Sequence, residues 1–386
     1  MPATLHAFLR LARKLHPHAP RIARGLHAVC RPLWDGLRRA PSPHAAASTL
    51  SRICPDPHGS ARCPRRQLPH ADYDLAVIVA AYNMEAYIAE CLDSILGQAT
   101  RYKVTVKVVD DGSTDATPSI LARYAARHKE VDVITLDSNQ GPAAARNAAL
   151  DRLNATYVAI VDADDLLAPG GIEAALGKAL ATDADAVETS LTRFHDDGRI
   201  DYTLTPADSD DTRHADIVGN STVFLYHWRM LADVRFPPGY QLEDEMLKGL
   251  VLPRARKIVS VSAPYYRYRV RRGSLCLSFN SPRQLHALYV GRSLYTDALA
   301  MGLWSDNATA PAVTTAYLRL VRFSFLHTFR FPPAVRKSVF SLWCDFHPAV
   351  ARHCRPQSPA DTELLDALTR RSYRDYEWNC IINQRW

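Results

Sequence analysis

The stretch AIVDADDLLAPGG at residues 159–171 is the most informative part of this chain. It begins as an apolar run and then places three carboxylates, Asp162, Asp164 and Asp165, within four positions. A short apolar run bounded in this way is typical of a buried strand. Carboxylates crowded at one point raise each other's pKa, and a bound divalent cation removes that cost. The stretch therefore predicts a strand that ends at a metal and phosphate site.

Apolar runs and helical patterns alternate along the chain before this stretch. We expect strands at 75–82, 104–115, 131–137 and 156–165, and helices at 85–98, 116–129 and 141–153. Strands that alternate with helices predict an α/β fold, with a mostly parallel sheet and helices on both of its faces. In such sheets, ligands bind beyond the carboxyl ends of the strands.

Polar side chains follow three of these strands. Tyr82 and Asn83 follow the first, Asp110 and Asp111 end the second, and the group that begins at Asp162 ends the fourth. A single Asp after a strand is usually a helix cap or a turn former. Three sets at one edge favour a ligand site instead. Oxygen ligands without His or Cys indicate Mg²⁺ or Mn²⁺ bridged to substrate phosphates.

The positive charge of the chain is confined to its start. The 386 residues have a formal net charge of +7, yet residues 1–70 carry 12 Arg and Lys against two Asp. The slightly acidic remainder has no nucleic-acid-binding motif, so we expect no nucleic-acid partner. Eight cysteines without a CxxC pair favour free thiols in a reducing compartment. Because we find neither a run of 18 apolar residues nor a secretory signal, we expect a cytoplasmic protein.

Both ends of the chain differ from the central part at 73–279. Residues 1–72 predict a basic, partly helical extension, with helices at 4–16 and 22–37 and a linker at 41–72. The basic helices either pack on the body or lie on an anionic membrane surface, at the inner face of the cell membrane. Residues 280–386 read as helical. They predict a packed appendage, an acceptor-binding surface, a dimer interface or a membrane-facing patch.

Several motifs occur in an order and at spacings that resemble a known family. They are VIVAAYN (77–83), VVDDGSTD (108–115), NQGPAAARNAAL (139–150) and VDADDLL (161–167). Together they resemble family 2 glycosyltransferases with the GT-A fold. The segments at 228–247 and 257–274 resemble the bacterial members that build surface and extracellular polysaccharides. The resemblance covers about residues 74–275.

The resemblance implies roles for the residues around the nucleotide. Asp111 would bind the uracil ring, and Tyr82 and Asn83 would line its pocket. The segment from Gly141 to Asn147 would form a turn below the nucleotide, with Arg146 near the Asp cluster. Small apolar residues at 143–145 replace the Ser that many relatives carry.

Further roles concern the reacting groups. Asp162 and Asp164 match the family's DxD motif. Asp164 would be the more direct metal ligand, and Asp162 would face the ribose or the donor sugar. Asp244 aligns with the catalytic base, although two acids beside it, Glu243 and Glu245, could confuse the assignment. Arg269 and Arg271 fall where a mobile loop is expected to close over the diphosphate.

The resemblance implies a reaction as well as a site. We expect a Mn²⁺- or Mg²⁺-dependent, inverting transfer from a nucleotide sugar, with a UDP-sugar favoured, to a hydroxyl of a growing or lipid-linked glycan. One alternative is a non-catalytic sugar-nucleotide-binding or assembly protein on the same fold. A nucleotidyltransferase would need a Gly- and Lys/Arg-rich loop after the first strand, which is absent from this sequence. A dinucleotide-binding oxidoreductase is disfavoured because no G-x-G-x-x-G follows any strand.

Overall fold

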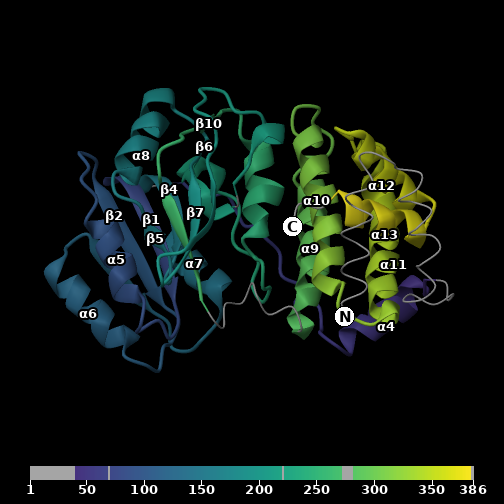
Figure 1. The fold of residues 1–386 in the computed structure, drawn as a ribbon, viewed down its shortest axis with the longest axis horizontal. Helices are drawn as coiled ribbons and strands as arrows, with labels where there is room; N and C mark the ends of the chain where they lie inside the picture. The colour runs from purple at the N-terminus through teal and green to yellow at the C-terminus, as the bar shows by residue number, and fades with distance from the viewer. Residues whose placement is uncertain (1–39, 68–69, 220, 272–280, 384–386) are drawn as a thin grey trace. The chain divides into compact units, whose positions relative to one another are not determined.

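The computed structural model describes residues 40–67, 70–219, 221–271 and 281–383. The helices predicted at 4–16 and 22–37 lie outside these residues. The chain divides into two compact units, one of residues 59–275 and one that combines residues up to 58 with those from 276 onward (Figure 1). The domain boundaries after residues 72 and 279 stay predictions.

Four parallel strands form the centre of the first unit. They are β1 (Tyr73–Ala81), β2 (Val104–Asp110), β3 (Val131–Thr135) and β4 (Ala155–Asp162). Their connections contain α5 (Ile88–Leu96), α6 (Thr117–Arg127) and α7 (Pro142–Asp151). The α/β alternation predicted from the sequence is therefore confirmed. Residues 75–79 of β1 have no exposed surface, which explains their continuously apolar sequence.

The order of the strands determines which face each helix covers. The larger sheet has the order β10-β6-β9-β4-β1-β2-β3. The chain moves from β1 through β2 to β3 and then returns to β4 on the other side of β1. Because such crossovers are right-handed, α5 and α6 lie on one face and α7 on the other. The reversal between β1 and β4 is a topological switch point.

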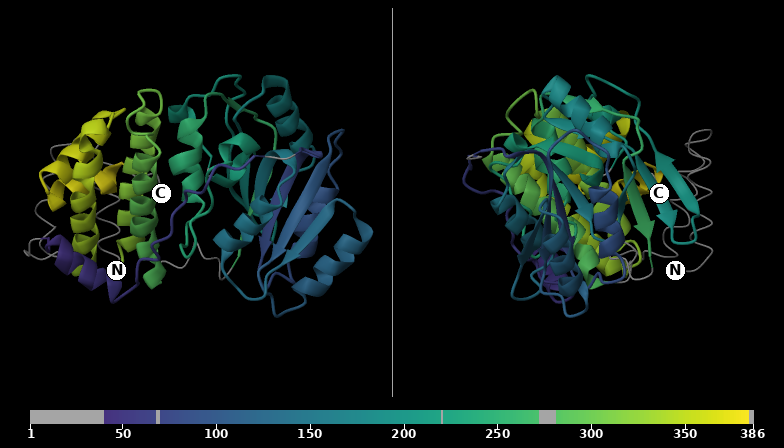
Figure 2. Two further views of the ribbon diagram at one scale, coloured as in Figure 1. Left: turned by 180° about the vertical axis from the view of Figure 1, so that it is seen from behind. Right: turned by 90° about the vertical axis from the view of Figure 1, so that its left-hand side faces the viewer.

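Three short strands extend this sheet beyond β4. They are β6 (Ala186–Glu188), β9 (Phe224–His227) and β10 (Ile258–Ser260), and β9 is antiparallel to both of its neighbours. Figure 2 shows the larger sheet from two further directions. Helix α8 (Gly171–Thr182) packs on β6 and β9, and a π-helix occupies Leu247–Val251.

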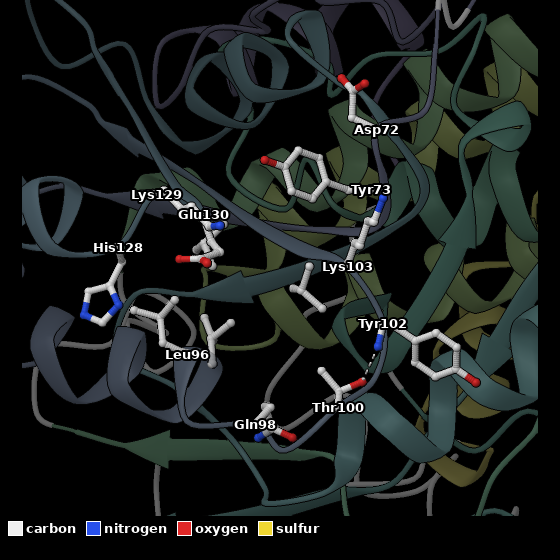
Figure 3. Close-up of a pocket in the computed structure, with 13 residues that line it drawn as sticks. Asp72, Tyr73, Leu96, Gln98, Thr100, Tyr102, Lys103, His128, Lys129 and Glu130 are labelled. Atoms are coloured by element: carbon white, nitrogen blue, oxygen red, sulfur yellow. Dashed lines mark hydrogen bonds between the residues drawn. The ribbon is translucent and has the colours of Figure 1, made fainter.

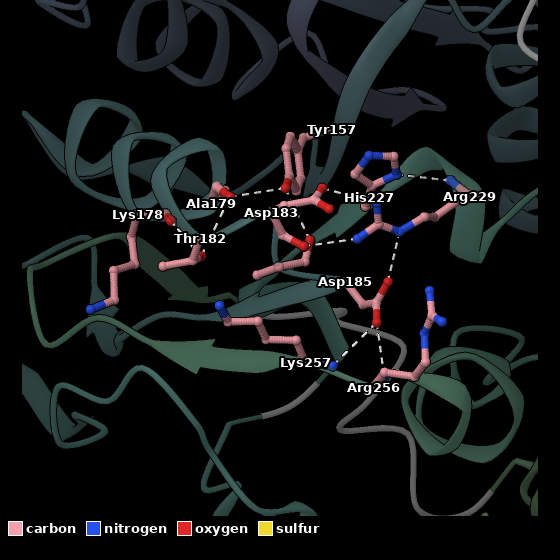
Figure 4. Close-up of polar contacts among 11 residues, drawn as sticks. Tyr157, Lys178, Ala179, Thr182, Asp183, Asp185, His227, Arg229, Arg256 and Lys257 are labelled. Atoms are coloured by element: carbon pink, nitrogen blue, oxygen red, sulfur yellow. Dashed lines mark hydrogen bonds and ion pairs between the residues drawn. The ribbon is translucent and has the colours of Figure 1, made fainter.

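One buried carboxylate ties together the segments around β6, β9 and β10 (Figure 4). Asp185 Oδ1 accepts a hydrogen bond from Arg229 Nε at 2.7 Å. Its other oxygen accepts the backbone N–H groups of Arg256 at 2.8 Å and Lys257 at 3.2 Å. The ion pair and the two backbone donors satisfy the buried charge, so the edge of the sheet is fixed near the start of β10.

A second, smaller sheet crosses the end of β4. Its order is β5-β11-β7-β8, and its strands are β5 (Leu166–Leu167), β7 (Leu191–His195), β8 (Ile200–Leu204) and β11 (Tyr266–Val270). Strand β11 runs parallel to β7, with Arg269 paired to Phe194. Because β5 follows the Asp cluster directly, this sheet brings β11 to the carboxylates.

The second unit is helical, as predicted for residues 280–386. Its helices are α9 (His286–Ala300), α10 (Ala310–Thr328), α11 (Pro333–Val350), α12 (Pro359–Thr369) and α13 (Tyr373–Ile382). Tyr317 is fully buried, and its ring makes edge contacts with Tyr295, Trp304 and Trp343. Within the described residues, no helix is both long enough and apolar enough to cross a bilayer.

The prediction of a linker at 41–72 is wrong for its first part. Residues Pro43–Ser51 form helix α4, which packs on α11 and buries Ala46 and Leu50 completely. Ser42 caps this helix by accepting the backbone N–H of Ala45, and proline occupies the first helical position. Both are helix-start signals. The high content of Pro, Ser and His in this segment obscured them.

Candidate active site

Three strands end at the same level at the carboxyl edge of the larger sheet. Ala80 of β1 pairs with Asp162 of β4, and Ala81 pairs with Asp110 of β2. This register brings together the polar groups that the sequence places after these strands. They lie beside the switch point between β1 and β4, where open sheets of this kind bind ligands.

The turn after β1 is tied to the turn after β2. Asn83 has a φ of 53°, which Asn tolerates better than most residues. Its backbone N–H donates to Ser113 Oγ at 3.0 Å, and its side-chain oxygen accepts the backbone N–H of Thr114 at 2.9 Å. The neighbouring Tyr82 is 40% exposed, so its ring lies at the rim of the site.

Asp111 joins the end of β2 to the start of α7. Its two oxygens accept the backbone N–H groups of Gln140 and Gly141, each at 2.8 Å. Burial raises the pKa of Asp111, and the two backbone donors oppose that shift. Gly141 precedes the first residue of α7 with φ 89° and ψ 165°, a conformation essentially restricted to glycine. The predicted nucleotide turn is therefore fixed to the sheet.

Arg146 of α7 connects two carboxylates from distant parts of the chain. Its guanidinium donates to Asp162 Oδ1 at 2.7 Å and to Glu243 Oε1. It is 6% exposed and lies over the ring of Phe236. Burial raises the pKa of Glu243 to about 7, while Arg146 opposes that shift. The family resemblance implied that Arg146 lies near the Asp cluster, which its bond to Asp162 agrees with, but gave no sign of its contact with Glu243.

Asp244 has a different partner from the acid that precedes it. Its Oδ2 accepts a hydrogen bond from Ser221 Oγ. Burial and the neighbouring Glu245 raise the pKa of Asp244, whereas Arg146 and the Ser221 hydroxyl lower it. The structure thus separates the two acids, because Glu243 pairs with an arginine and Asp244 with a hydroxyl. Sequence reasoning missed Ser221 altogether.

Asp165 is the member of the Asp cluster whose two oxygens are both bonded to strand β11. It is 1% exposed, accepts the hydroxyl of Tyr266 at 2.8 Å and accepts the backbone N–H of Arg269 at 2.7 Å. Burial, together with the charges of Asp162 and Asp164, raises its pKa well above the ordinary range. Both donors come from β11, so Asp165 attaches the smaller sheet to the end of β4.

Arg269 is enclosed by its neighbours. Its guanidinium forms ion pairs with Glu90 at 2.6 Å and with Asp196. The group also lies over the rings of Tyr87 and Phe194, at 5.5 and 4.9 Å from their centroids. These contacts place the side chain beside the Asp cluster while using most of its hydrogen-bonding capacity.

Arg271 points at the predicted metal ligand. Its Nε donates to Asp164 Oδ2, and its guanidinium lies 5.5 Å from the centroid of Tyr87. In this structure the arginine therefore supplies the positive charge that Asp164 requires. The expected loop is wrong for Arg269, which lies in strand β11 and pairs with Phe194 of β7. A contact of either arginine with a diphosphate stays a prediction.

The two predicted metal ligands are each bonded to an arginine and keep some exposed surface. The side chains of Asp162 and Asp164 are 36% and 18% exposed. Among the described residues, no three His, Cys, Asp or Glu side chains gather into a group that could hold a metal. Mg²⁺ and Mn²⁺ accept one or two carboxylates when waters and substrate phosphates complete the shell. The hard oxygen atoms present here fit such an ion.

A separate cavity of about 920 Å³ lies at the opposite end of the strands (Figure 3). Its lining includes Tyr73 and Val104, which begin β1 and β2, together with Tyr102, Lys103 and His128. It contains none of the predicted site residues. The sheet rule for ligands favours the carboxyl edge, so we place the candidate site there.

Comparison with known proteins shows which family and which solved structures this chain resembles. Residues 76–231 match the family model of glycosyl transferase family 2. The glycosyltransferase GlyA of Streptococcus pneumoniae is 29% identical over 237 residues, which are 56% of this chain and 33% of that protein. The putative glycosyltransferase EpsH of Bacillus subtilis is 29% identical over 52% of this chain and 62% of its own length. The chain thus spans about a third of GlyA and less than two thirds of EpsH.

A solved structure shares the fold over a larger part of the chain. The crystal structure of Staphylococcus aureus TarS 1–349 in complex with UDP-GlcNAc matches with a TM-score of 0.63 and 22% identity. The match covers 79% of this chain and 90% of that one. Residues 76–231 are therefore similar to glycosyl transferase family 2, and the likeness to TarS shows a shared fold, in agreement with the GT-A type of fold that the sequence motifs predicted.

Proposed function

We propose that this chain is an inverting glycosyltransferase that moves a sugar from a UDP-sugar to a hydroxyl of a growing glycan. The observation that carries the proposal is that three kinds of charged group gather near the carboxyl end of β4: partly exposed carboxylates, a buried arginine and a further carboxylate. Asp162 and Asp164 would supply oxygen ligands to a cation, Arg146 is a buried positive charge bonded to Asp162, and Asp244 is a carboxylate with one oxygen bonded to Ser221. A transfer from a nucleotide sugar needs groups of each kind.

On the donor side, the described residues bind and orient the nucleotide. Asp111 and Tyr82 would hold the base, and the start of α7 at Gly141 would lie below the nucleotide. Asp162 and Asp164 would hold Mn²⁺ or Mg²⁺, which when bound stabilises the charge of a leaving diphosphate as a Lewis acid. Arg271 lies next to Asp164 and would add a second positive charge near that group.

On the acceptor side, Asp244 acts as general base. It takes the proton of the acceptor hydroxyl as the oxygen attacks the anomeric carbon and the nucleoside diphosphate departs with the bonding electrons. General base catalysis of this kind contributes about 10²- to 10⁴-fold. Attack from the face opposite the leaving group inverts the configuration of the anomeric carbon.

The relatives support a polysaccharide as the acceptor class. The succinoglycan biosynthesis protein ExoO of Rhizobium meliloti is 36% identical over 126 residues, 33% of this chain and 35% of its own. We propose a glycan or lipid-linked glycan acceptor at the cytoplasmic side of the cell membrane. The basic residues of the first 70 positions would favour contact with anionic lipid there.

Ligand-induced thermal stabilisation tests the donor. UDP, several UDP-sugars and GDP-mannose are each added with and without Mn²⁺, and UDP-GlcNAc comes first because the TarS structure contains it. A ligand at 100 times its Kd should stabilise the protein by about 2.7 kcal/mol. A shift with uridine nucleotides that needs Mn²⁺ would support the proposal. No shift with any nucleotide would contradict it.

Two substitutions separate binding from chemistry. Asp164→Ala should abolish Mn²⁺-dependent transfer while the protein stays folded, and full activity would remove Asp164 as a ligand. Asp244→Asn should bind UDP normally and lose about 10²- to 10⁴-fold in kcat. If a UDP-sugar binds but the wild type transfers nothing to any glycan, the non-catalytic binding protein becomes the better interpretation.

A further inference from the structure

A buried carboxylate that the reaction does not use holds the segment next to Asp244. Glu188 ends β6 and has no exposed surface. Its Oε1 accepts the backbone N–H groups of Val218 and Gly219, each at 2.7 Å, and its Oε2 accepts the hydroxyl of Ser260 at 3.2 Å. A buried carboxylate is costly unless its oxygens are hydrogen-bonded. Two of the three bonds come from consecutive amides, those of Val218 and Gly219, in the segment that connects β8 to β9.

The same segment is fixed from two other elements. Lys248, in the π-helix, donates from Nζ to the carbonyl of Gly219 at 2.7 Å. The hydroxyl of Tyr226, in β9, donates to the carbonyl of Ser221 at 2.9 Å, and Tyr226 is completely buried. The backbone is therefore hydrogen-bonded at positions 218, 219 and 221, close to the Ser221 side chain.

Ser221 is 4% exposed, and its hydroxyl donates to Asp244 Oδ2. Within the described part of the chain, no hydrogen bond is made to Asp244 Oδ1. One oxygen of the carboxylate is thus fixed while the other remains able to accept a proton. A general base must lie within hydrogen-bonding distance of the proton that it removes, with a lone pair directed at that proton. A hydrogen bond that fixes Oδ2 also fixes the direction of Oδ1.

We propose that Ser221, held in place by Glu188, is a positioning residue that orients the Asp244 carboxylate toward the acceptor hydroxyl. The inference rests on the proposed function, because it gives Asp244 the role of base. The proton passes from the acceptor hydroxyl to Asp244 Oδ1, the acceptor oxygen bonds to the anomeric carbon, and the diphosphate oxygen leaves with its electron pair. Ser221 keeps its own proton throughout.

Kinetics of Ser221→Ala provide the first test. We expect kcat to fall about 10- to 100-fold, the range for a lost hydrogen bond to a charged group, with the Kd for UDP unchanged. Ser338→Ala is the matched control, because Ser338 is also buried and its hydroxyl makes one hydrogen bond, to the carbonyl of Ala334 in α11, outside the first unit. In an Asp244→Asn background, Ser221→Ala should cost nothing further. Wild-type kcat in Ser221→Ala, or an equal loss in both backgrounds, would overturn the proposal.

Glu188 is tested by a conservative and a disruptive change. Glu188→Gln keeps an oxygen for both amides and should retain most of kcat. Glu188→Ala leaves both amides without an acceptor, so kcat should fall as it does in Ser221→Ala. An equal loss of kcat in both variants would show that the charge of Glu188 is what matters, and would contradict a role for its hydrogen bonds to the two amides.

A stability cycle distinguishes this inference from the proposed function. Wild type, Ser221→Ala, Asp244→Asn and the double variant are unfolded in urea. The contact predicts that the two substitutions are coupled in their unfolding free energies. Failure of the wild type to transfer any sugar would count against the proposed function, and the cycle would still decide whether Ser221 holds Asp244. Additive effects would overturn the inference even in an active enzyme.

Discussion

At the scale of single residues, Arg146 makes the crowded carboxylates compatible with folding. It stands between Asp162 and Glu243 and is nearly as buried as the latter. The charges that face it come from the end of β4 and from the segment around residue 243, which are far apart in sequence. Asp165 shows the alternative, since it is buried without a cation and is satisfied by a hydroxyl and an amide.

Arg146→Met should therefore destabilise the first unit strongly. The methionine fills most of the space but leaves two carboxylates without their cation, and breaking a buried ion pair in this way costs about 3–5 kcal/mol. Urea unfolding followed by fluorescence would measure the loss. Arg199→Met is the control, because the Arg199 side chain is 60% exposed where it pairs with Asp201, and it should change stability by about 0–1 kcal/mol. A loss for Arg146→Met as small as that for the control would contradict the argument.

At the scale of elements, the start of α7 depends on a backbone conformation as well as on side chains. Gly141→Ala should cost about 1–3 kcal/mol, because φ 89° with ψ 165° is strained for any residue with a Cβ. The added methyl group would meet no atom within 4 Å, so the cost comes from the backbone. Displacement of this turn should also weaken UDP binding.

Gly198→Ala is the matched control for this prediction. Gly198 has φ 83° and equally open space around its Cβ position, but it lies between β7 and β8. Its substitution should lower stability by a similar amount and leave the Kd for UDP unchanged. Calorimetric titration of both variants would show whether the turn before α7 has a specific part in nucleotide binding.

The end of β9 makes the stability of the first unit depend on pH. Burial, together with the nearby charge of Arg229, lowers the pKa of His227 from 6.5 to about 4. Its Nδ1 accepts the backbone N–H of Arg229 at 3.2 Å (Figure 4), so the imidazole must be neutral to cap this turn. The unfolded chain gains the proton near pH 6.5 and the folded chain only near pH 4. The stability from this group is therefore present above pH 6.5 and lost as the pH falls toward 4.

His227→Asn should remove this dependence. Asparagine keeps an acceptor for the Arg229 amide but does not titrate. Between pH 7 and pH 5, wild type should lose about 2 kcal/mol more stability than the variant, from about 1.4 kcal/mol per pH unit below pH 6.5. Urea unfolding at both pH values gives the difference directly. Equal losses in the two proteins would show that His227 is protonated in the folded state.

At the scale of the whole molecule, the sequence predicts the part of the fold that local patterns encode. The four central strands are continuously apolar, their helices are amphipathic, and polar residues mark where strands end, so the sheet edge with Asp111, Asp162 and Asp164 could be placed in advance. The contacts between Arg146 and Glu243 and between Glu188 and Gly219 could not be predicted from the sequence. They join residues far apart in sequence, and an isolated Glu or Ser carries no pattern that names its partner.

The second unit has a core of its own, and this leads to a prediction about the whole chain. Trp343 of α11 is completely buried, contacts the ring of Tyr317 and donates from Nε1 to Ser324 Oγ at 2.7 Å. Trp343→Ala should destabilise this unit by about 3–5 kcal/mol. Because the candidate nucleotide site lies entirely within residues 59–275, UDP with Mn²⁺ should still raise the unfolding temperature of the first unit. Scanning calorimetry of the variant should then show two transitions, of which only the later one responds to nucleotide. A single transition that shifts with both the substitution and the ligand would mean that the two units unfold together.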